Sequence, residues 1–237
     1  MRSVAVLTLC AVLLGCSGED VSTDGELIDT VSDGRLIPLA GEERAVWAIG
    51  VIAGTADCDD PDLIPLSTAL EAADERGDEL DAFLADVPIS VAFEHVLTAY
   101  DDETPPFDGS LFEADTAMIG MMYRLAQRGE GNAMNEIGIA QYRCYLSVER
   151  DVCEAVDWLN DARLSGDRLA AASLGYMSLG GAGLSRNETI GLNRLRYAAR
   201  HGDLEAAGVI ASYEAGELDE FLAAPPLGPL CKDEARP

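Results

Sequence analysis

The chain has 237 residues, of which 48% are hydrophobic and 6% aromatic, and its formal net charge is −27. Enough apolar residues are present for a packed core, which excludes a wholly disordered chain. A surface this acidic excludes binding to nucleic acid, because phosphates need a basic surface, and excludes adsorption to anionic lipid headgroups. Solubility and self-repulsion account for the charge, and attraction of a cationic partner or of metal ions is the alternative.

The first residues are typical of an export signal. A short positive start precedes the apolar run Val4–Leu14, which suits a signal peptide and is too short to cross a bilayer. The run ends in the letters LLGC at residues 13–16. This ending resembles the lipobox of bacterial lipoproteins, and an ordinary signal peptide that is cut elsewhere is the alternative. The resemblance implies that residues 1–15 are removed and that Cys16 becomes a lipidated N-terminus.

The same resemblance implies a location. A lipidated Cys16 would anchor the chain to the cell envelope, and this lipid would be its only contact with a membrane. The residue after Cys16 is not Asp, which implies the outer membrane, with the chain facing the periplasm or exposed at the surface. Residues 16–35 are small, polar and acidic without periodicity, so they are predicted to be a flexible tether.

Residues 36–112 are predicted to be helical. An apolar helix is expected over 42–51 and a second one over 61–76. The apolar stripe of residues 89–100 fits a helix slightly better than a strand. The letters ALEAADERGD at 69–78 resemble the helix end and glycine of a degenerate or capping repeat. No convincing alternation typical of strands occurs, and an all-α fold is therefore expected.

An internal repeat occupies residues 113–218. The glycines Gly129, Gly166 and Gly202 each follow a predicted helical run, and they are separated by 37 and 36 residues. Glycine favours the left-handed conformation that ends a helix, and small residues at fixed positions let helices approach closely. Each unit is predicted to be a helix, a tight turn and a second helix, which buries its apolar face only by stacking on its neighbours.

The unit at residues 162–199 carries the clearest pattern. It contains Gly166, Ala170, Leu174-Gly175 and the letters GAGLSRN at 181–187. This pattern resembles the Sel1-like repeat, a relative of the tetratricopeptide repeat. The resemblance covers about two and a half units. It implies a short α-solenoid of antiparallel helix pairs in residues 113–218, followed by a C-terminal tail at 219–237.

Two positions support the alignment and others depart from it. Asp151 and Asn187 stand where a helix N-cap belongs in successive units. Where the family has a tyrosine in its first helix, one unit has Gln141 or its neighbour Tyr142 and the next has Ser178. The tryptophan of one unit, Trp158, is replaced by arginine in the next.

The cysteines predict two disulfides. One cysteine lies in the signal and Cys16 is the expected lipidation site, which leaves an even number in an exported protein. Cysteines at four positions allow three pairings. Two of them flank a predicted turn between helices, which favours the pair Cys144–Cys153 and leaves Cys58 with Cys231. Closely spaced cysteines that join a helix pair are also a property of the cysteine-rich branch of the Sel1-like family. No CxxC motif and only two histidines are present, so no metal site is expected.

The sequence indicates binding rather than catalysis. It contains no nucleophile elbow, P-loop, HExxH motif or dinucleotide-binding glycine motif, so no catalytic residue and no cofactor is expected. The resemblance implies a concave surface formed by the first helix of each unit, where Gln141, Tyr145 and Met177 are candidate contacts for a protein or peptide partner in the envelope. A weak β-lactam-binding hydrolase of the cysteine-rich Sel1-like type and a passive structural lipoprotein are the alternatives.

Overall fold

The computed structural model describes residues 28–30, 36–38, 42–54, 58, 61–228 and 230–231. Its regular elements in these ranges are helices, apart from the antiparallel pair of short strands β1 (Ile28–Thr30) and β2 (Leu36–Pro38). The expected all-α class is confirmed. Strand β1 falls in the predicted tether, so that prediction is wrong at residues 28–30. The helices are α2 (Glu42–Ala53), α3 (Leu66–Asp74), α4 (Gly77–Leu84), α5 (Ile89–Asp101), α6 (Leu111–Gln127), α7 (Gly131–Arg143), α8 (Val152–Leu164), α9 (Leu169–Gly180), α10 (Glu188–Ala199), α11 (Leu204–Glu214) and α12 (Asp219–Ala223).

The predicted signal peptide at residues 1–15 and the lipidation site Cys16 lie outside the described residues. Within the described ranges, none of the helices combines the length and the apolar character that crossing a bilayer requires.

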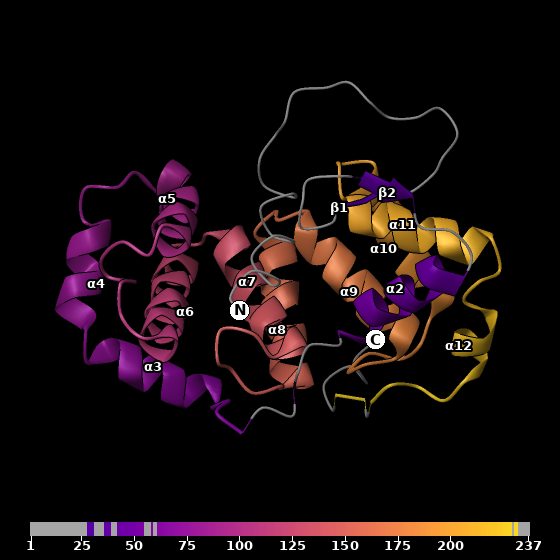
Figure 1. Cartoon of the computed structure of the whole chain (residues 1–237), viewed down its shortest axis with the longest axis horizontal. Coiled ribbons are helices and arrows are strands. Elements are labelled where there is room, and N and C mark those ends of the chain that lie inside the picture. Colours follow the sequence, from indigo (N-terminus) through magenta and orange to yellow (C-terminus); the bar gives the residue numbers. More distant parts are fainter. Residues whose placement is uncertain are drawn as a thin grey trace.

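Helices α3 to α6 form one end of the molecule, at the left of Figure 1. Helix α6 is the buried element of this group, and α3, α4 and α5 contact it. Its start is fixed by a capping box, in which Ser110 accepts a hydrogen bond from the backbone of Glu113 and the Glu113 carboxylate accepts one from the backbone of Ser110. Gly120 allows close approach of α3, since a Cβ there would lie 2.5 Å from the Cβ of Ala73.

Helices α7 to α11 follow as consecutive, contacting elements across the other half of the molecule (Figure 1). The three repeat glycines adopt left-handed conformations just after α6, α8 and α10, with φ of 89° at Gly129, 94° at Gly166 and 96° at Gly202. Asp151 caps α8 and Asn187 caps α10 through side-chain hydrogen bonds to backbone N–H groups. The predicted helix ends and both predicted caps are confirmed.

The same type of close contact occurs in two helix pairs. A Cβ added at Gly138 on α7 would lie 2.8 Å from the Leu159 side chain on α8. A Cβ added at Gly175 on α9 would lie 2.8 Å from the Leu195 side chain on α10. The two glycines are 37 positions apart, which is the spacing found in the sequence. Each second helix therefore places a leucine where the first helix has no side chain.

Helix α2 lies apart from the helices that follow it in sequence. It contacts α9 and α11, and its buried Ala48 and Ile52 belong to the same apolar cluster as Leu195 and Val209 (Figure 1). An ion pair of 2.5 Å between Arg44 and Glu217 also joins it to the C-terminal helices. Residues 36–112 are therefore not one packing unit, because α2 packs with the C-terminal half and α3 to α5 pack with α6.

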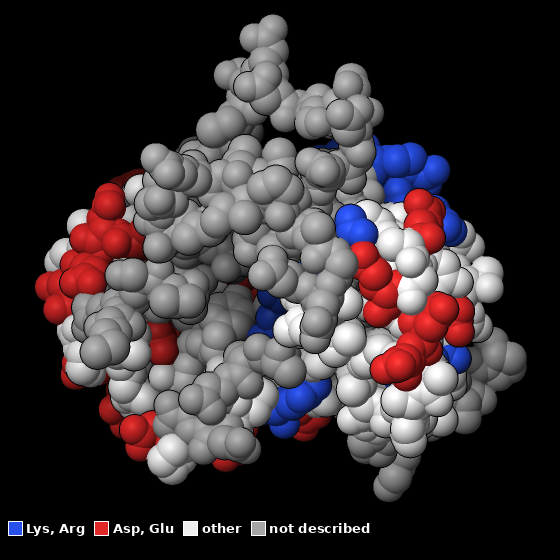
Figure 2. All heavy atoms as spheres, turned by 45° about the vertical axis from the view of Figure 1, so that its right-hand side comes forward, with Lys and Arg blue, Asp and Glu red and all other residues white. Residues whose placement is uncertain are grey.

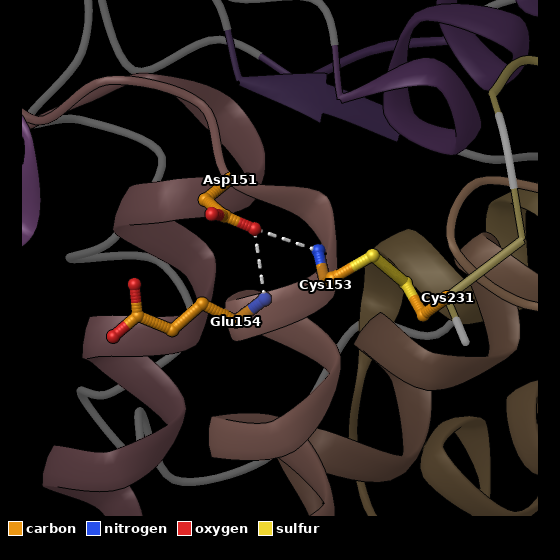
Figure 3. The surroundings of a disulfide bond; sticks show 4 residues. All are labelled: Asp151, Cys153, Glu154 and Cys231. Atoms are coloured by element: carbon orange, nitrogen blue, oxygen red, sulfur yellow. Dashed lines mark hydrogen bonds between the residues drawn. A yellow bond between two sulfur atoms is a disulfide. The ribbon is translucent and has the colours of Figure 1, made fainter. Parts of the chain in front are cut away.

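The four cysteines among the described residues form two disulfides, but the predicted pairing is wrong. Cys58 is bonded to Cys144, with a Cα–Cα distance of 5.2 Å, and Cys153 is bonded to Cys231, with a distance of 5.4 Å. Cys144 ends α7 in a left-handed conformation, whereas Cys153 lies in the first turn of α8 beside the C-terminal segment (Figure 3). The turn therefore gives the two cysteines different partners, and each disulfide ties a distant segment to the α7–α8 pair.

Candidate functional site

The described surface is hollowed between α3 and the start of α8. Two adjoining hollows of about 460 and 320 Å³ share Glu149 and Arg150 in their walls. We call them together the α3–α8 groove. Its larger part is bounded by α3, by one residue each of α6 and α7, and by the first two turns of α8. Side chains from α3 and from the consecutive helices α6, α7 and α8 therefore meet at one place.

Backbone contacts fix the groove at the α7–α8 loop. The segment before α3 pairs with this loop, since Ile64 N donates to Ser147 O at 2.9 Å and Glu149 N donates to Ile64 O at 2.8 Å. Leu146 and Ser147 both have positive φ, so the loop turns sharply between the two helices. The Cys58–Cys144 disulfide adds a covalent tie next to these hydrogen bonds. The loop and α3 are thus held together as the two sides of the groove.

The apolar wall of the groove is partly aromatic. Tyr123 of α6 and Trp158 of α8 are half-buried and meet edge to face, with ring centroids 6.1 Å apart. Leu66 and Leu70 of α3 line the same hollow, and Ser67 lies exposed between them. A wall of this kind suits the apolar part of a ligand side chain, and the aromatic rings also suit a cation.

Gln141 is the most buried polar residue that lines the groove, with 1% of its surface exposed. Its amide nitrogen donates to the Glu154 carboxylate at 2.6 Å, which fixes which end of the amide carries the oxygen. The amide oxygen Oε1 is buried and has no hydrogen-bond partner among the described residues. A buried acceptor without a donor carries a free-energy cost, and this residue lines the groove.

The rim of the groove is acidic. Glu149, Asp151 and Glu154 are exposed residues of its lining. Figure 3 shows the Asp151 carboxylate held by the backbone N–H groups at the start of α8, while the Glu154 carboxylate points away from the disulfide. The basic lining residue, Arg150, is engaged elsewhere, because its Nη2 donates to Ala53 O at 3.1 Å and its guanidinium lies over a tyrosine ring.

The surface outside the groove is also mostly negatively charged. Figure 2 shows acidic side chains gathered along the left edge of that face, whereas basic side chains are concentrated at its upper right. Of the whole chain, 43 residues are Asp or Glu and 16 are Lys or Arg. The field around the molecule therefore attracts cations in general, and the groove adds shape and hydrogen bonding to that attraction.

A buried polar cluster lies behind the α7–α8 loop. The Tyr145 hydroxyl donates to the Glu136 carboxylate, the Ser147 hydroxyl donates to Asp115 at 2.7 Å, and the Tyr100 hydroxyl donates to Asp115 at 2.6 Å. Burial raises the pKa of Glu136 to about 7, and the hydrogen bond from Tyr145 acts in the opposite direction. Both carboxyl groups are oriented by hydroxyl donors, which gives this cluster a structural role under the loop.

The predicted contact residues do not form an exposed surface. Met177 is fully buried in the apolar core of α8 and α9, and Tyr145 is half-buried with its hydroxyl turned inward to Glu136. Gln141 is also buried, although it lines the groove. The expectation of these three residues as open contacts on the first helices is therefore wrong.

Packing against neighbouring helices is the physical reason for this difference. Met177 lies in the apolar cluster that α9 shares with α8. Gln141 is held by Glu154 of α8, and Tyr145 is held by Glu136 of α7. One signal in the sequence does indicate the burial of Met177, because α9 (Leu169–Gly180) has serine as its only polar residue type, and a helix that is apolar all round is buried on all sides. No comparable local pattern in the sequence indicated that the residues of α3 and Trp158 would line a groove.

Comparison with protein-family models finds no family that matches the chain, and comparison with curated proteins finds no matching relative.

Proposed function

We propose that the chain is an envelope-anchored scaffold, lipidated at Cys16, that binds an extended segment of a partner protein in the α3–α8 groove. The observation that carries this proposal is the unpaired Gln141 oxygen in a groove with an aromatic wall and an acidic rim. Such a combination of apolar area with a few placed polar groups is typical of a recognition site. The groove replaces the first-helix surface as the proposed binding surface.

We also propose that residues 113–218 are Sel1-like repeats. The left-handed glycines after α6, α8 and α10, and the equivalent contacts of Gly138 with Leu159 and of Gly175 with Leu195, support this assignment. In a stack of helix pairs, each unit presents its loops and helix starts on one side, where partner binding is common. The α7–α8 loop, which forms one side of the groove, is such a loop.

Photo-crosslinking in intact cells tests the proposed groove. A photoreactive amino acid replaces Ser67, which is exposed in the groove, and in a control chain it replaces Leu204, which is 65% exposed on α11. We expect one partner adduct from position 67 that disappears when Leu70→Glu blocks the groove. Adducts that are the same from both positions, or that survive the blocking substitution, would contradict the proposal.

The anchor is tested separately. Metabolic labelling with a palmitate analogue should label the wild-type chain, and Cys16→Ser should abolish the label and release the chain from the membrane fraction. A labelled Cys16→Ser chain would contradict lipidation at this residue. The Ser67 adduct can be lost with the anchor, so the groove is judged only in the lipidated chain.

A further inference from the structure

We propose that the α3–α8 groove takes the cationic end of an arginine or lysine side chain of the partner segment, with Gln141, Glu154 and Trp158 as its contacts. The proposal rests on the function proposed above and narrows it to partner segments that carry a basic residue. Four features of the groove support it: the type of hydrogen bond that is missing, the charge of the rim, the aromatic wall and the apolar side of α3.

The missing hydrogen bond requires a donor. The amide nitrogen of Gln141 is committed to Glu154, so the unpaired atom is the oxygen Oε1. An oxygen acceptor is satisfied by an N–H or O–H group and not by a carboxylate or phosphate. Guanidinium and ammonium groups carry several donors, so one such group can bond to Gln141 and to the neighbouring carboxylate of Glu154 together.

The acidic rim of the groove favours a positively charged ligand. Glu149 and Glu154 place two carboxylates on the groove, and the carboxylate of Asp151 already accepts from the first turn of α8. Arg150 also lines the groove and offsets one of these three negative charges, so the lining keeps an excess of negative charge. A cation is therefore favoured and an anion is repelled.

The walls suit the shape of a basic side chain. Trp158 offers the aromatic face that binds cations best, and guanidinium groups also stack on such faces. Leu66 and Leu70 on the opposite side can cover the methylene stem, which long basic side chains bury along apolar surface. The groove therefore has an apolar part that suits the methylene stem and an acidic, aromatic part that suits the charged end.

Fluorescence titration tests the proposal directly. The chain has two tryptophans, so Trp47→Phe leaves Trp158 as the only reporter, and it reports from inside the groove. The probe is the capped pentapeptide Ala-Ala-Arg-Ala-Ala, and the comparison peptide has citrulline, a neutral near-isostere, in place of arginine. We expect a saturable change of Trp158 emission with the arginine peptide and binding weaker by about tenfold with the citrulline peptide.

Substitutions then assign the contacts. Glu154→Gln should weaken binding of the arginine peptide about tenfold, and Gln141→Met, which keeps the size but removes the acceptor, should weaken it several-fold. Glu220→Gln on α12, an exposed acidic residue away from the groove, is the matched control and should leave the affinity unchanged. Thermal unfolding of each variant verifies that the fold is kept.

Three results would overturn the proposal: equal binding of both peptides, wild-type affinity of Glu154→Gln, or no saturable response up to about 10 mM peptide. The outcomes also separate this inference from the function on which it rests. If the Ser67 adduct forms in cells and the arginine response is absent, the groove binds a partner by other groups and only the cation site is wrong. If both are absent, both proposals are wrong.

Discussion

The hydroxyl of Tyr142, at the end of α7, donates a hydrogen bond to the backbone carbonyl of Ile52, at the end of α2. The two residues are 90 positions apart, and both are almost completely buried. Gly54 lies against the same ring so closely that a Cβ there would be 2.8 Å from it. This contact fixes the end of α2 on the end of α7, and the Cys58–Cys144 disulfide is a second link to the end of α7.

Tyr142→Phe tests the strength of this attachment. The substitution keeps the ring but leaves the Ile52 carbonyl without its donor, and an unsatisfied buried group costs about 1–3 kcal/mol of unfolding free energy. Chemical denaturation should show this loss, and hydrogen exchange should be faster in α2 than in α6. Tyr213→Phe is the control, because that hydroxyl bonds to Glu188 at an exposed site. A Tyr142→Phe protein as stable as the wild type would show that this hydrogen bond does not hold α2 in place.

The glycine contacts of the two helix pairs predict matched effects. Gly138→Ala and Gly175→Ala should each reduce the unfolding free energy by about 1–3 kcal/mol, because the new methyl group would overlap Leu159 or Leu195. Gly77→Ala is the control: the nearest atom to its Cβ is the end of the flexible Arg124 side chain, at 3.3 Å. Alanine there should be neutral or stabilising. If Gly138→Ala were stabilising, the close contact of α7 with α8 would be disproved.

The disulfide pairing predicts a specific peptide map. Trypsin cuts after Arg143 and Arg150, so Cys144 and Cys153 fall on different peptides and each of the four cysteines can be followed separately. Non-reducing mass spectrometry should find Cys58 linked to Cys144 and Cys153 linked to Cys231. A Cys144–Cys153 linkage would refute this pairing.

Loss of either bond should also be costly. The disulfides join residues 86 and 78 positions apart, and closure of loops this long is worth about 4–5 kcal/mol each in the chain-entropy account. The double variants Cys58→Ala/Cys144→Ala and Cys153→Ala/Cys231→Ala should therefore unfold at lower denaturant concentration. Cys58 lines the groove and Cys153 lies in the first turn of α8 beside it, so loss of either bond should also weaken the arginine-dependent change of Trp158 emission.

Local backbone requirements were readable from the sequence, and contacts between distant segments were not. Gly129, Gly166 and Gly202 end helices because of their own conformational freedom, and Asp151 caps the helix that it precedes. These features need no knowledge of the rest of the fold. They predicted the helix ends in the second half of the chain correctly.

The groove and the disulfides depend on where α2 and α3 dock. The helical period of α7 and α9 does not reveal which of their faces other helices will cover, so Gln141 and Met177 were expected among the partner contacts, whereas both are buried. Proximity in sequence suggested Cys144–Cys153, whereas the left-handed turn at Cys144 directs it to the segment after α2. Long-range docking, rather than propensity, decided each of these outcomes.

The buried Glu136 predicts an unusual pH dependence of stability. Burial raises its pKa from 4.5 to about 7, so between these values the folded chain holds a proton that the unfolded chain has lost. The contribution of this group to stability therefore falls as pH rises from about 4.5 to 7, and the full penalty remains above that. Glu136→Gln keeps an oxygen acceptor for Tyr145 and cannot ionise. It should raise the unfolding free energy by roughly 2 kcal/mol at pH 8 and leave it nearly unchanged at pH 4.

The contribution of Glu113 to stability should change with pH in the opposite direction, so this residue serves as the control. Its hydrogen bonds with Ser110 lower the pKa of this carboxyl, so its contribution to stability is present at neutral pH and is lost as pH falls. Glu113→Gln should therefore destabilise the chain at pH 7 and have less effect in acid. Denaturant unfolding of the two variants across pH 4 to 8 should give differences from the wild type that move in opposite directions. Parallel pH profiles would mean that Glu136 is ionised and solvated in the folded chain, and that the cluster behind the α7–α8 loop is open to water.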